Sequence, residues 1–376
     1  MKRVKLLASS KQIQAHLNAL CRDIGTRIAA TKNEQRAADY VARCMTRIGL
    51  SNVTQQRFPF TDWGYDVCEL LVHDGQWRAV KCTPVVQSPS TPPKGIEAEV
   101  VYVDSGSAAD LKGRNVKGKI LLIWGAFGET TEKLARLGRC GAAALMWVDT
   151  RLPFHWPVAM GVPYDWRRHL TVPQVCIPYL PAWRLAQSRR PRARLRIKTW
   201  TREAESLNVF GDLPGRGREM AHVGGHMDTV MLGTGADDDA SGVAATLEVA
   251  RLLADLGQTP RRTIRFLAYG AEEQLSEGSR QYVLVHRDAA KRTRLCVNFD
   301  AIGSIAGQSD ARVVGGEDLM KAVRRLDGGL SEVKAEVCPY SDMFAFNISG
   351  APSVWFYRTN MPNMRFFHHS AHDDLK

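Results

Sequence analysis

The spacing of apolar residues changes twice along this chain and divides it into three stretches. At the start, residues 9–25 and 33–50 carry apolar side chains at helical spacing, and the first run stops at Gly25. These two runs predict a pair of helices.

The middle stretch replaces helical spacing by short apolar runs between turn residues, which is typical of strands. The predicted strands lie at 67–75, 98–106, 118–125, 143–150 and 174–180. One helix is expected at 130–141, and the Pro/Ser-rich segment 83–95 is interpreted as a connector. We therefore expect a separate, β-rich unit.

From about Asn208 onward, predicted strands alternate with predicted helices. The strands lie at 219–226, 262–270, 294–303 and 351–358, and the helices at 240–257 and 278–288. This order predicts an α/β fold with a mostly parallel central sheet flanked by helices on both faces. Ligands of such sheets bind beyond the carboxyl ends of the strands.

Acidic and imidazole side chains gather at those strand ends. They are His226 and Asp228, Glu272 and Glu273, Asp300, and, after a loop, His368, His369 and His372. Three consecutive aspartates, 237–239, lie between the first strand and its helix. So many carboxylates cannot all stay ionised side by side without compensation, and a divalent metal pair provides it. Imidazole and carboxylate ligands together suit zinc.

Each of these motifs has a simpler interpretation when it is taken alone. Aspartates before a helix cap its N-terminus, and adjacent glutamates on a turn are usually solvated. Only their coincidence at successive strand ends favours a metal site. Within the triplet, Asp237 and Asp239 are better explained as capping or supporting residues than as ligands.

Composition and charge narrow the class of protein. Hydrophobic residues make up 44% of the 376, which indicates a globular chain, and no apolar run approaches the roughly 20 residues of a membrane span. The start of the chain has no signal-peptide core, so a cytoplasmic protein is expected. The eight cysteines form no C-x-x-C pair, and reduced thiols are expected.

The net charge of +12 is concentrated in residues 184–202. Arginine or lysine at 192, 194, 196 and 198 alternates with apolar residues, which predicts a strand with one basic and one apolar face. This strand is either a surface for anionic partners or a solvated face, and we favour the solvated face. No nucleic-acid partner and no membrane are expected.

The C-terminal stretch resembles a known family, the dizinc exopeptidases of metallopeptidase family twenty-eight. The motifs "HMD", "GADDDASG", "AEE", "NFD" and "HSAHDD" carry this resemblance over residues 208–376, in the family's order. The N-terminal helices also resemble the family, and "GRNVKGKILLIWG" is similar to the protease-associated domain of many members. The resemblance implies a zinc peptidase domain at 1–62 plus 203–376, with an inserted protease-associated-like domain at 63–202.

The resemblance also implies a role for each residue of the site. The five implied ligands of two zinc ions are His226, Asp238, Glu273, Asp300 and His369. One ion would take His226, Asp238 and Asp300, and the other would take Asp238, Glu273 and His369. Glu272 would be the general base, and Asp228 would orient His226.

The implied activity is that of an aminopeptidase acting on peptides. A carboxypeptidase is the alternative, in which Arg358 and Arg365 would bind the substrate carboxylate, and a non-catalytic receptor on the same fold is another. His369 is the implied metal ligand, and the neighbouring His368 could help to stabilise an oxyanion. The chain departs from the family at Met343, where many members have a histidine.

Overall fold

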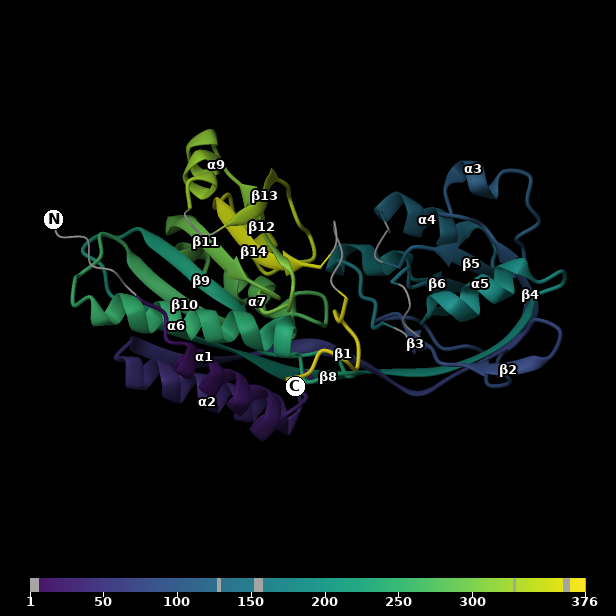
Figure 1. Ribbon diagram of the computed structural model, residues 1–376, viewed down its shortest axis with the longest axis horizontal. Coiled ribbons are helices and arrows are strands. Elements are labelled where there is room, and N and C mark those ends of the chain that lie inside the picture. The colour runs from purple at the N-terminus through teal and green to yellow at the C-terminus, as the bar shows by residue number, and fades with distance from the viewer. Residues whose placement is uncertain (1–6, 127–129, 152–157, 327–328, 361–365, 376) are drawn as a thin grey trace. The chain divides into compact units, whose positions relative to one another are not determined.

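The computed structural model describes residues 7–126, 130–151, 158–326, 329–360 and 366–375 of the chain. The chain divides into two compact units, as Figure 1 shows. The first unit contains Met1–Phe60 and Ala204–Lys376, and the second contains Thr61–Glu203.

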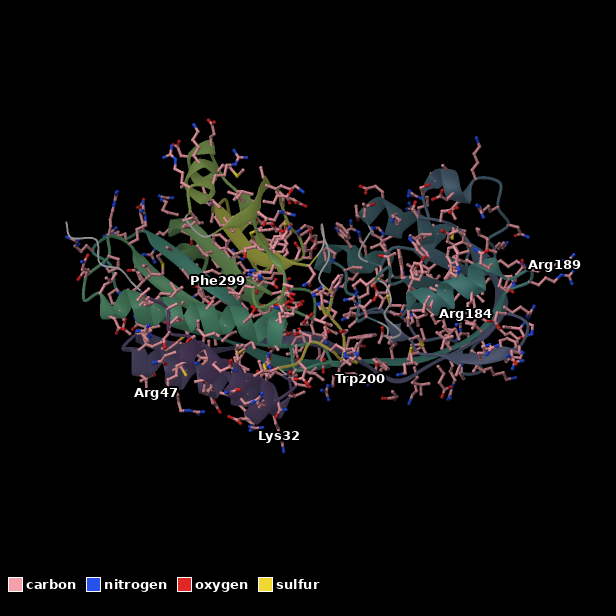
Figure 2. The ribbon with its side chains drawn as sticks, viewed as in Figure 1. Lys32, Arg47, Arg184, Arg189, Trp200 and Phe299 are labelled. Atoms are coloured by element: carbon pink, nitrogen blue, oxygen red, sulfur yellow. The ribbon has the colours of Figure 1, made fainter. Side chains whose placement is uncertain are left out.

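The first unit begins with the predicted helical pair. Helix α1 spans Ser10–Leu17 and continues as a π-helical segment, Asn18–Ile24, and α2 spans Lys32–Ile48. The Thr31 side chain caps the start of α2, and Gly49 ends this helix with a φ of 89°. Lys32 and Arg47, near the two ends of α2, point away from the sheet (Figure 2).

The sheet of the first unit is mostly parallel, as predicted. Its strand order is β13-β12-β14-β11-β9-β10-β8. The strands are β8 (Arg192–Leu213), β9 (Met220–His226), β10 (Thr263–Tyr269), β11 (Thr293–Phe299), β12 (Gln308–Val314), β13 (Leu330–Ala335) and β14 (Ser353–Thr359). The β12/β14 and β8/β10 pairs are antiparallel, and the remaining neighbours are parallel.

Helices cover both faces of this sheet, because alternate residues of a strand point to opposite faces. In β10, Phe266 and Ala268 pack in the core under α2 and α6, whereas Leu267 and Tyr269 pack on the other face with α7 and α10. The helices that follow α2 in this unit are α6 (Gly242–Asp255), α7 (Glu277–Val285), α8 (Arg287–Arg292), α9 (Glu317–Arg324) and α10 (Met343–Ile348).

The second unit has more helix than the sequence predicted. Its strands are the end of β1 (Ser51–His73), β2 (Trp77–Val80), β3 (Thr83–Pro84), β4 (Ile96–Tyr102), β5 (Ile120–Trp124), β6 (Ala144–Val148), β7 (Gln174–Ile177) and the start of β8. Its helices are α3 (Ala108–Leu111), α4 (Thr131–Arg139) and α5 (Tyr179–Gln187). Only α4 was predicted. Helix α5 buries just Ala182 and Leu185, which is too few apolar positions to reveal a helical period.

The basic segment of β8 is a strand with one buried and one exposed face, as predicted. The side chains of Ala193, Leu195 and Ile197 are buried, and the intervening basic residues are exposed. Arg192 and Arg194 pair with Glu97 of β4, Arg196 pairs with Glu69, and Lys198 pairs with Asp66. The positive charge of this face is therefore partly balanced within the unit.

Among the described residues, no helix combines the length and the apolar character that crossing a membrane requires.

Candidate metal centre

Three neighbouring parallel strands end at the same edge of the first unit's sheet. The register pairs Tyr269 of β10 with His226 of β9, and β11 runs parallel to β9 on its other side. Asp300 follows β11 directly, and Glu272 and Glu273 follow β10 after a short turn. The topology thus brings side chains that are up to 74 positions apart in the sequence to one place, which is where ligands bind in such sheets.

His226, Asp238 and Asp300 form the first group of potential ligands. Their ligand atoms all lie within 4.8 Å of one another, and all three side chains are buried. The Nε2 atom of His226 lies 3.0 Å from Oδ1 of Asp238. This is the set that the sequence predicted for one of the two metal ions.

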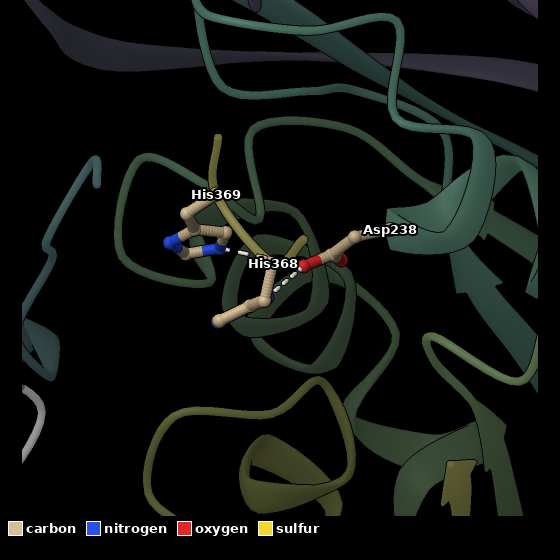
Figure 3. Close-up of side chains that lie close together, drawn as sticks. All are labelled: Asp238, His368 and His369. Atoms are coloured by element: carbon tan, nitrogen blue, oxygen red, sulfur yellow. Dashed lines mark hydrogen bonds and ion pairs between the residues drawn. The ribbon is translucent and has the colours of Figure 1, made fainter. Parts of the chain in front are cut away.

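The second group lies on the other oxygen of Asp238, as Figure 3 shows. Oδ2 of Asp238 is 2.5 Å from Nδ1 of His368 and 3.4 Å from Nε2 of His369. The same Nε2 atom of His369 lies 3.0 Å from Oε2 of Glu273. Asp238 therefore faces both groups, one with each oxygen.

The two histidines lie close together, so the structure adds a fourth residue to the predicted second set. Their rings lie with centroids 3.6 Å apart at 30° to each other. His369 reaches both Asp238 and Glu273, as the predicted ligand role requires, whereas His368 reaches Asp238. The assignment of His369 as the ligand remains a prediction.

The donor chemistry of both groups fits zinc, which imidazole and carboxylate ligands suit. Among the described residues, Oε1 of Glu273 is buried without a hydrogen-bond partner, which is costly unless a cation or proton satisfies it. Burial raises the pKa of Glu273. Burial alone would lower the pKa of His226, but Asp228 and Asp238 together raise it well above its ordinary value. The imidazole of His226 thus offsets part of the negative charge of the carboxylates around it.

Glu272 is placed beside these groups and belongs to neither of them. Its Oε1 accepts a hydrogen bond of 3.0 Å from the hydroxyl of Ser276. Burial raises the pKa of Glu272 well above its ordinary value. A buried carboxyl group with a raised pKa beside potential metal ligands is a candidate general base or acid.

Asp228 holds the turn that carries both glutamates. Its two carboxylate oxygens accept hydrogen bonds from the backbone amides of Glu272 and Glu273, at 3.0 and 3.1 Å. The carboxylate lies 3.6 Å from Nδ1 of His226, which is 3.3 Å from the Asp228 carbonyl oxygen. Asp228 therefore holds the turn of the two glutamates in addition to contacting His226, its predicted partner.

The two outer aspartates of the triplet fix backbone segments. The carboxylate of Asp239 is fully buried and accepts hydrogen bonds from the backbone amides of His226, Gly242 and Ala301. Asp237 accepts a hydrogen bond of 2.7 Å from the amide of Gly303. The peptide bond between Asp238 and Asp239 is cis.

Asp373 holds the triplet from the C-terminal segment. Its two oxygens accept hydrogen bonds from the amides of Asp237 and Asp238, at 2.7 and 3.0 Å. The same segment carries His368 and His369, so one stretch of chain both supplies potential ligands and positions Asp238.

Arg27 is a residue of this region that sequence reasoning missed. Its side chain is fully buried, and it donates hydrogen bonds to the carbonyl oxygens of Met227 and Thr234, each at 2.7 Å. It also donates to the carbonyls of Leu20, Gly25 and Gly235. One guanidinium thus ties the N-terminal segment to the two segments that carry His226 and Asp238. No periodicity or motif marks it, because all of these partners are backbone groups.

Glu34 is a second buried residue that no pattern revealed. It accepts hydrogen bonds from the Ser206 hydroxyl at 2.5 Å and from the amide of Ala30 at 2.7 Å. Burial, followed by the nearby charge of Asp228, raises the pKa of Glu34 to about 8. Asp342, which is also buried, has a pKa raised by burial to about 7.

Of the two arginines that were predicted to bind a substrate carboxylate, the structure describes Arg358. Arg358 donates to the carbonyl oxygens of Ser304 and Gly307 and to the hydroxyl of Ser309. It would have to give up some of these bonds to hold a substrate, and its binding role stays a prediction. Arg365 lies outside the described residues.

Comparisons with known proteins agree with this site. Residues 208–376 match the profile of Peptidase family M28, and this part of the chain is a Peptidase family M28 domain. The chain is 26% identical to carboxypeptidase Q of Bos taurus, over 74% of this chain and 62% of the relative. It is 28% identical to an aminopeptidase of Pseudomonas aeruginosa, over 74% of this chain and 54% of the relative. It therefore spans less than two thirds of the length of these two relatives.

A solved structure extends the likeness to nearly the whole chain. The zinc aminopeptidase of Bacillus subtilis superimposes with a TM-score of 0.74 at 25% identity, over 99% of this chain and 90% of that one. The α/β fold predicted from the sequence is thus confirmed.

Proposed function

We propose that this protein is a zinc-dependent exopeptidase that removes N-terminal residues from peptides. The observation that carries the proposal is the position of Asp238, whose two oxygens face two groups of imidazole and carboxylate ligands. Two metal ions that share one carboxylate lie about 3.5–4 Å apart in enzymes of this kind. In this proposal His226 and Asp300 complete one site, and Glu273 and His369 complete the other.

The chain's own residues account for the proton transfers. Bound zinc ions would supply Lewis acidity and lower the pKa of a water molecule towards neutrality. Glu272 takes a proton from the attacking water and gives it to the leaving amine. The Ser276 hydroxyl and the amide contact to Asp228 hold Glu272 in place for both steps. The raised pKa of Glu272 favours this exchange, because a higher pKa makes the carboxylate a stronger base.

The role of the middle segment rests on the resemblance of "GRNVKGKILLIWG" to the protease-associated domain of the family. We assign the peptidase role to the unit that contains the site and a protease-associated role to residues 63–202. A cytoplasmic location remains part of the proposal, as does the absence of nucleic-acid and membrane partners.

The first experiment combines metal analysis with a panel of peptides. We expect about two zinc ions per chain and hydrolysis of peptides with a free amino end, whereas peptides with a blocked amino end should remain intact. Cleavage from the carboxyl end would establish the carboxypeptidase alternative, which one relative's name favours. Two bound zinc ions without hydrolysis of any peptide would favour a non-catalytic receptor.

The second experiment tests Glu272 itself. Glu272→Gln should retain both metal ions and reduce kcat by about 100- to 10,000-fold, the range that general base catalysis supplies. Glu317→Gln, on the exposed face of α9, is the matched control and should keep full activity. Full activity of Glu272→Gln would show that the base is another group.

A further inference from the structure

A pair of cysteines in the second unit lies in contact, away from the metal centre. The Sγ atoms of Cys68 and Cys82 are 3.2 Å apart, although the two residues are 14 positions apart in the sequence. Both side chains are partly buried and pack at the edge of a core that includes Leu70 and Val72. The expectation of reduced, scattered thiols does not account for this contact.

The strand register explains why the two sulfurs meet. β1 and β2 pair antiparallel, with Leu70 opposite Val80 and His73 opposite Trp77. Continuing this register by two residues places Cys68 directly opposite Cys82. Directly opposite residues of an antiparallel pair have Cβ atoms about 4.5–5.5 Å apart, and a disulfide needs about 3.5–4.5 Å. A small closure of the two strands is therefore enough to join the sulfurs.

We propose that Cys68 and Cys82 are a modification site that forms a disulfide with a low-molecular-weight disulfide as oxidant. The thiolate of one cysteine attacks a sulfur of the oxidant, which forms a mixed disulfide and releases one small thiol. The second cysteine then loses its proton, attacks the protein sulfur of the mixed disulfide and releases the second small thiol. The protein gives up two protons and two electrons, and the oxidant is reduced to two thiols.

The surroundings favour this pair over the other cysteines. Among the described residues, the remaining thiols are buried, except for that of Cys140. The Cys140 thiol donates a hydrogen bond to the carbonyl oxygen of Leu137. The contact with Cys82, together with burial, raises the pKa of Cys68. Because the thiolate is the attacking species, the exchange should be slow at neutral pH and faster in alkaline solution.

Oxidation has a local structural consequence. The bond would close a loop at the base of the β1–β2 hairpin, and closing a loop of this size removes conformational freedom from the unfolded chain. The hairpin should therefore open less readily in the oxidised protein. In the cytoplasmic location proposed above, the pair would stay reduced until an oxidant is supplied, whereas the bond would persist in an oxidising compartment.

Peptide mapping of the full chain tests the proposal. The reduced protein is treated with oxidised glutathione at about pH 8.5, near the ordinary thiol pKa. It is then quenched in acid, alkylated in denaturant and digested with trypsin without reductant. Cleavage after Arg57, Arg78, Lys81 and Lys94 yields peptides 58–78 and 82–94, which carry one cysteine each. We expect these two peptides joined, with a mass lower than their sum by two hydrogens.

Matched variants make the outcome decisive. The joined species should vanish in Cys68→Ser and in Cys82→Ser, and it should persist in Cys140→Ser. Hydrogen exchange of peptides from β1 and β2 should slow on oxidation, with no change in peptides from α2. Recovery of both cysteines in separate peptides, alkylated or bound to glutathione, would overturn the proposal. A bond from either cysteine to a third one would overturn it as well.

Discussion

Replacing Arg27 by methionine should lower both the free energy of unfolding of the first unit and the zinc affinity of the metal centre. The carbonyl oxygens of Leu20 and Gly235 would keep a backbone partner, because they also accept from the amides of Gly25 and Ala240. In the described part of the chain, the carbonyls of Gly25, Met227 and Thr234 accept hydrogen bonds from Arg27 alone. The substitution would therefore leave three carbonyl groups without this partner, of which that of Met227 is buried and those of Gly25 and Thr234 are part-buried.

The size of the effect follows from that count. An orphaned buried acceptor costs about 1–3 kcal/mol, whereas the two part-buried carbonyls can be hydrated and cost less. We expect a loss of about 1–3 kcal/mol in the free energy of unfolding of the first unit. Residues that support metal ligands typically change metal affinity by about 10- to 100-fold, and a loss of that size is expected for zinc.

Two measurements separate these effects. Hydrogen exchange on peptides of the first unit reports its stability without a contribution from the second unit. Competition with a chromophoric chelator reports zinc affinity. Arg27→Lys keeps the charge but loses the planar fork of donors, so it should fall between wild type and Arg27→Met. Arg43→Met, on the exposed face of α2, is the control and should change stability by less than about 0.5 kcal/mol.

Two results would contradict these expectations for Arg27→Met. If Arg27→Met bound zinc with wild-type affinity while exchange in the first unit accelerated, Arg27 would stabilise the fold without positioning the ligands. If neither property changed, the hydrogen bonds of the guanidinium would contribute nothing measurable.

Three further changes should each alter one property of the first unit. Burial raises the pKa of Glu34 to about 8 from its ordinary value near 4.5, so the folded state binds the extra proton between these values. The stability that this carboxyl contributes is present below about pH 4.5 and is lost as the pH rises through 8, by up to about 5 kcal/mol. Glu34→Gln should flatten that decline in urea unfolding measured from pH 5 to 8, and an unchanged slope would contradict it. Asp238→Asn should reduce bound zinc from about two ions to one or fewer by elemental analysis, and retention of two would show that Asp238 is not shared. In Gly242→Ala the new Cβ would collide with the carbonyl oxygen of Phe299 and the carboxylate of Asp239, so the melting temperature should fall; Gly316→Ala, whose Cβ meets no atom within 4 Å, should change the melting temperature much less.

Those parts of the fold and site that depend on local pattern could be predicted from the sequence. β9, β10, β11 and β14 are short apolar runs, and parallel strands bring their carboxyl ends to one edge. This order was enough to predict that acidic and imidazole side chains gather at that edge, whereas the set of His226, Asp238 and Asp300 was implied by the resemblance to the family. In contrast, β12, α9 and β13 lie in a stretch whose mixed polar composition gave no clear period.

The supporting residues could not be predicted, for a physical reason. Arg27, Glu34 and Asp373 bind mostly backbone groups, and a backbone amide or carbonyl has the same chemistry at every position. Nothing in the sequence marks which one a buried side chain will meet. The choice between His368 and His369 is of the same kind, because both lie within reach of Asp238 and the contact of His369 with Glu273, which the fold creates, separates them.

The aspartate triplet shows how a row of like charges becomes tolerable. The carboxylates of Asp237 and Asp239 accept hydrogen bonds from backbone amides, and burial raises the pKa of Asp239 well above its ordinary value. The amides of Asp237 and Asp238 are in turn held by Asp373. Only Asp238 turns its carboxylate towards the histidines. The backbone of the loop is thus fixed by hydrogen bonds that involve no metal ligand atom, so removing metal should raise the electrostatic strain on Asp238 while the loop keeps its path.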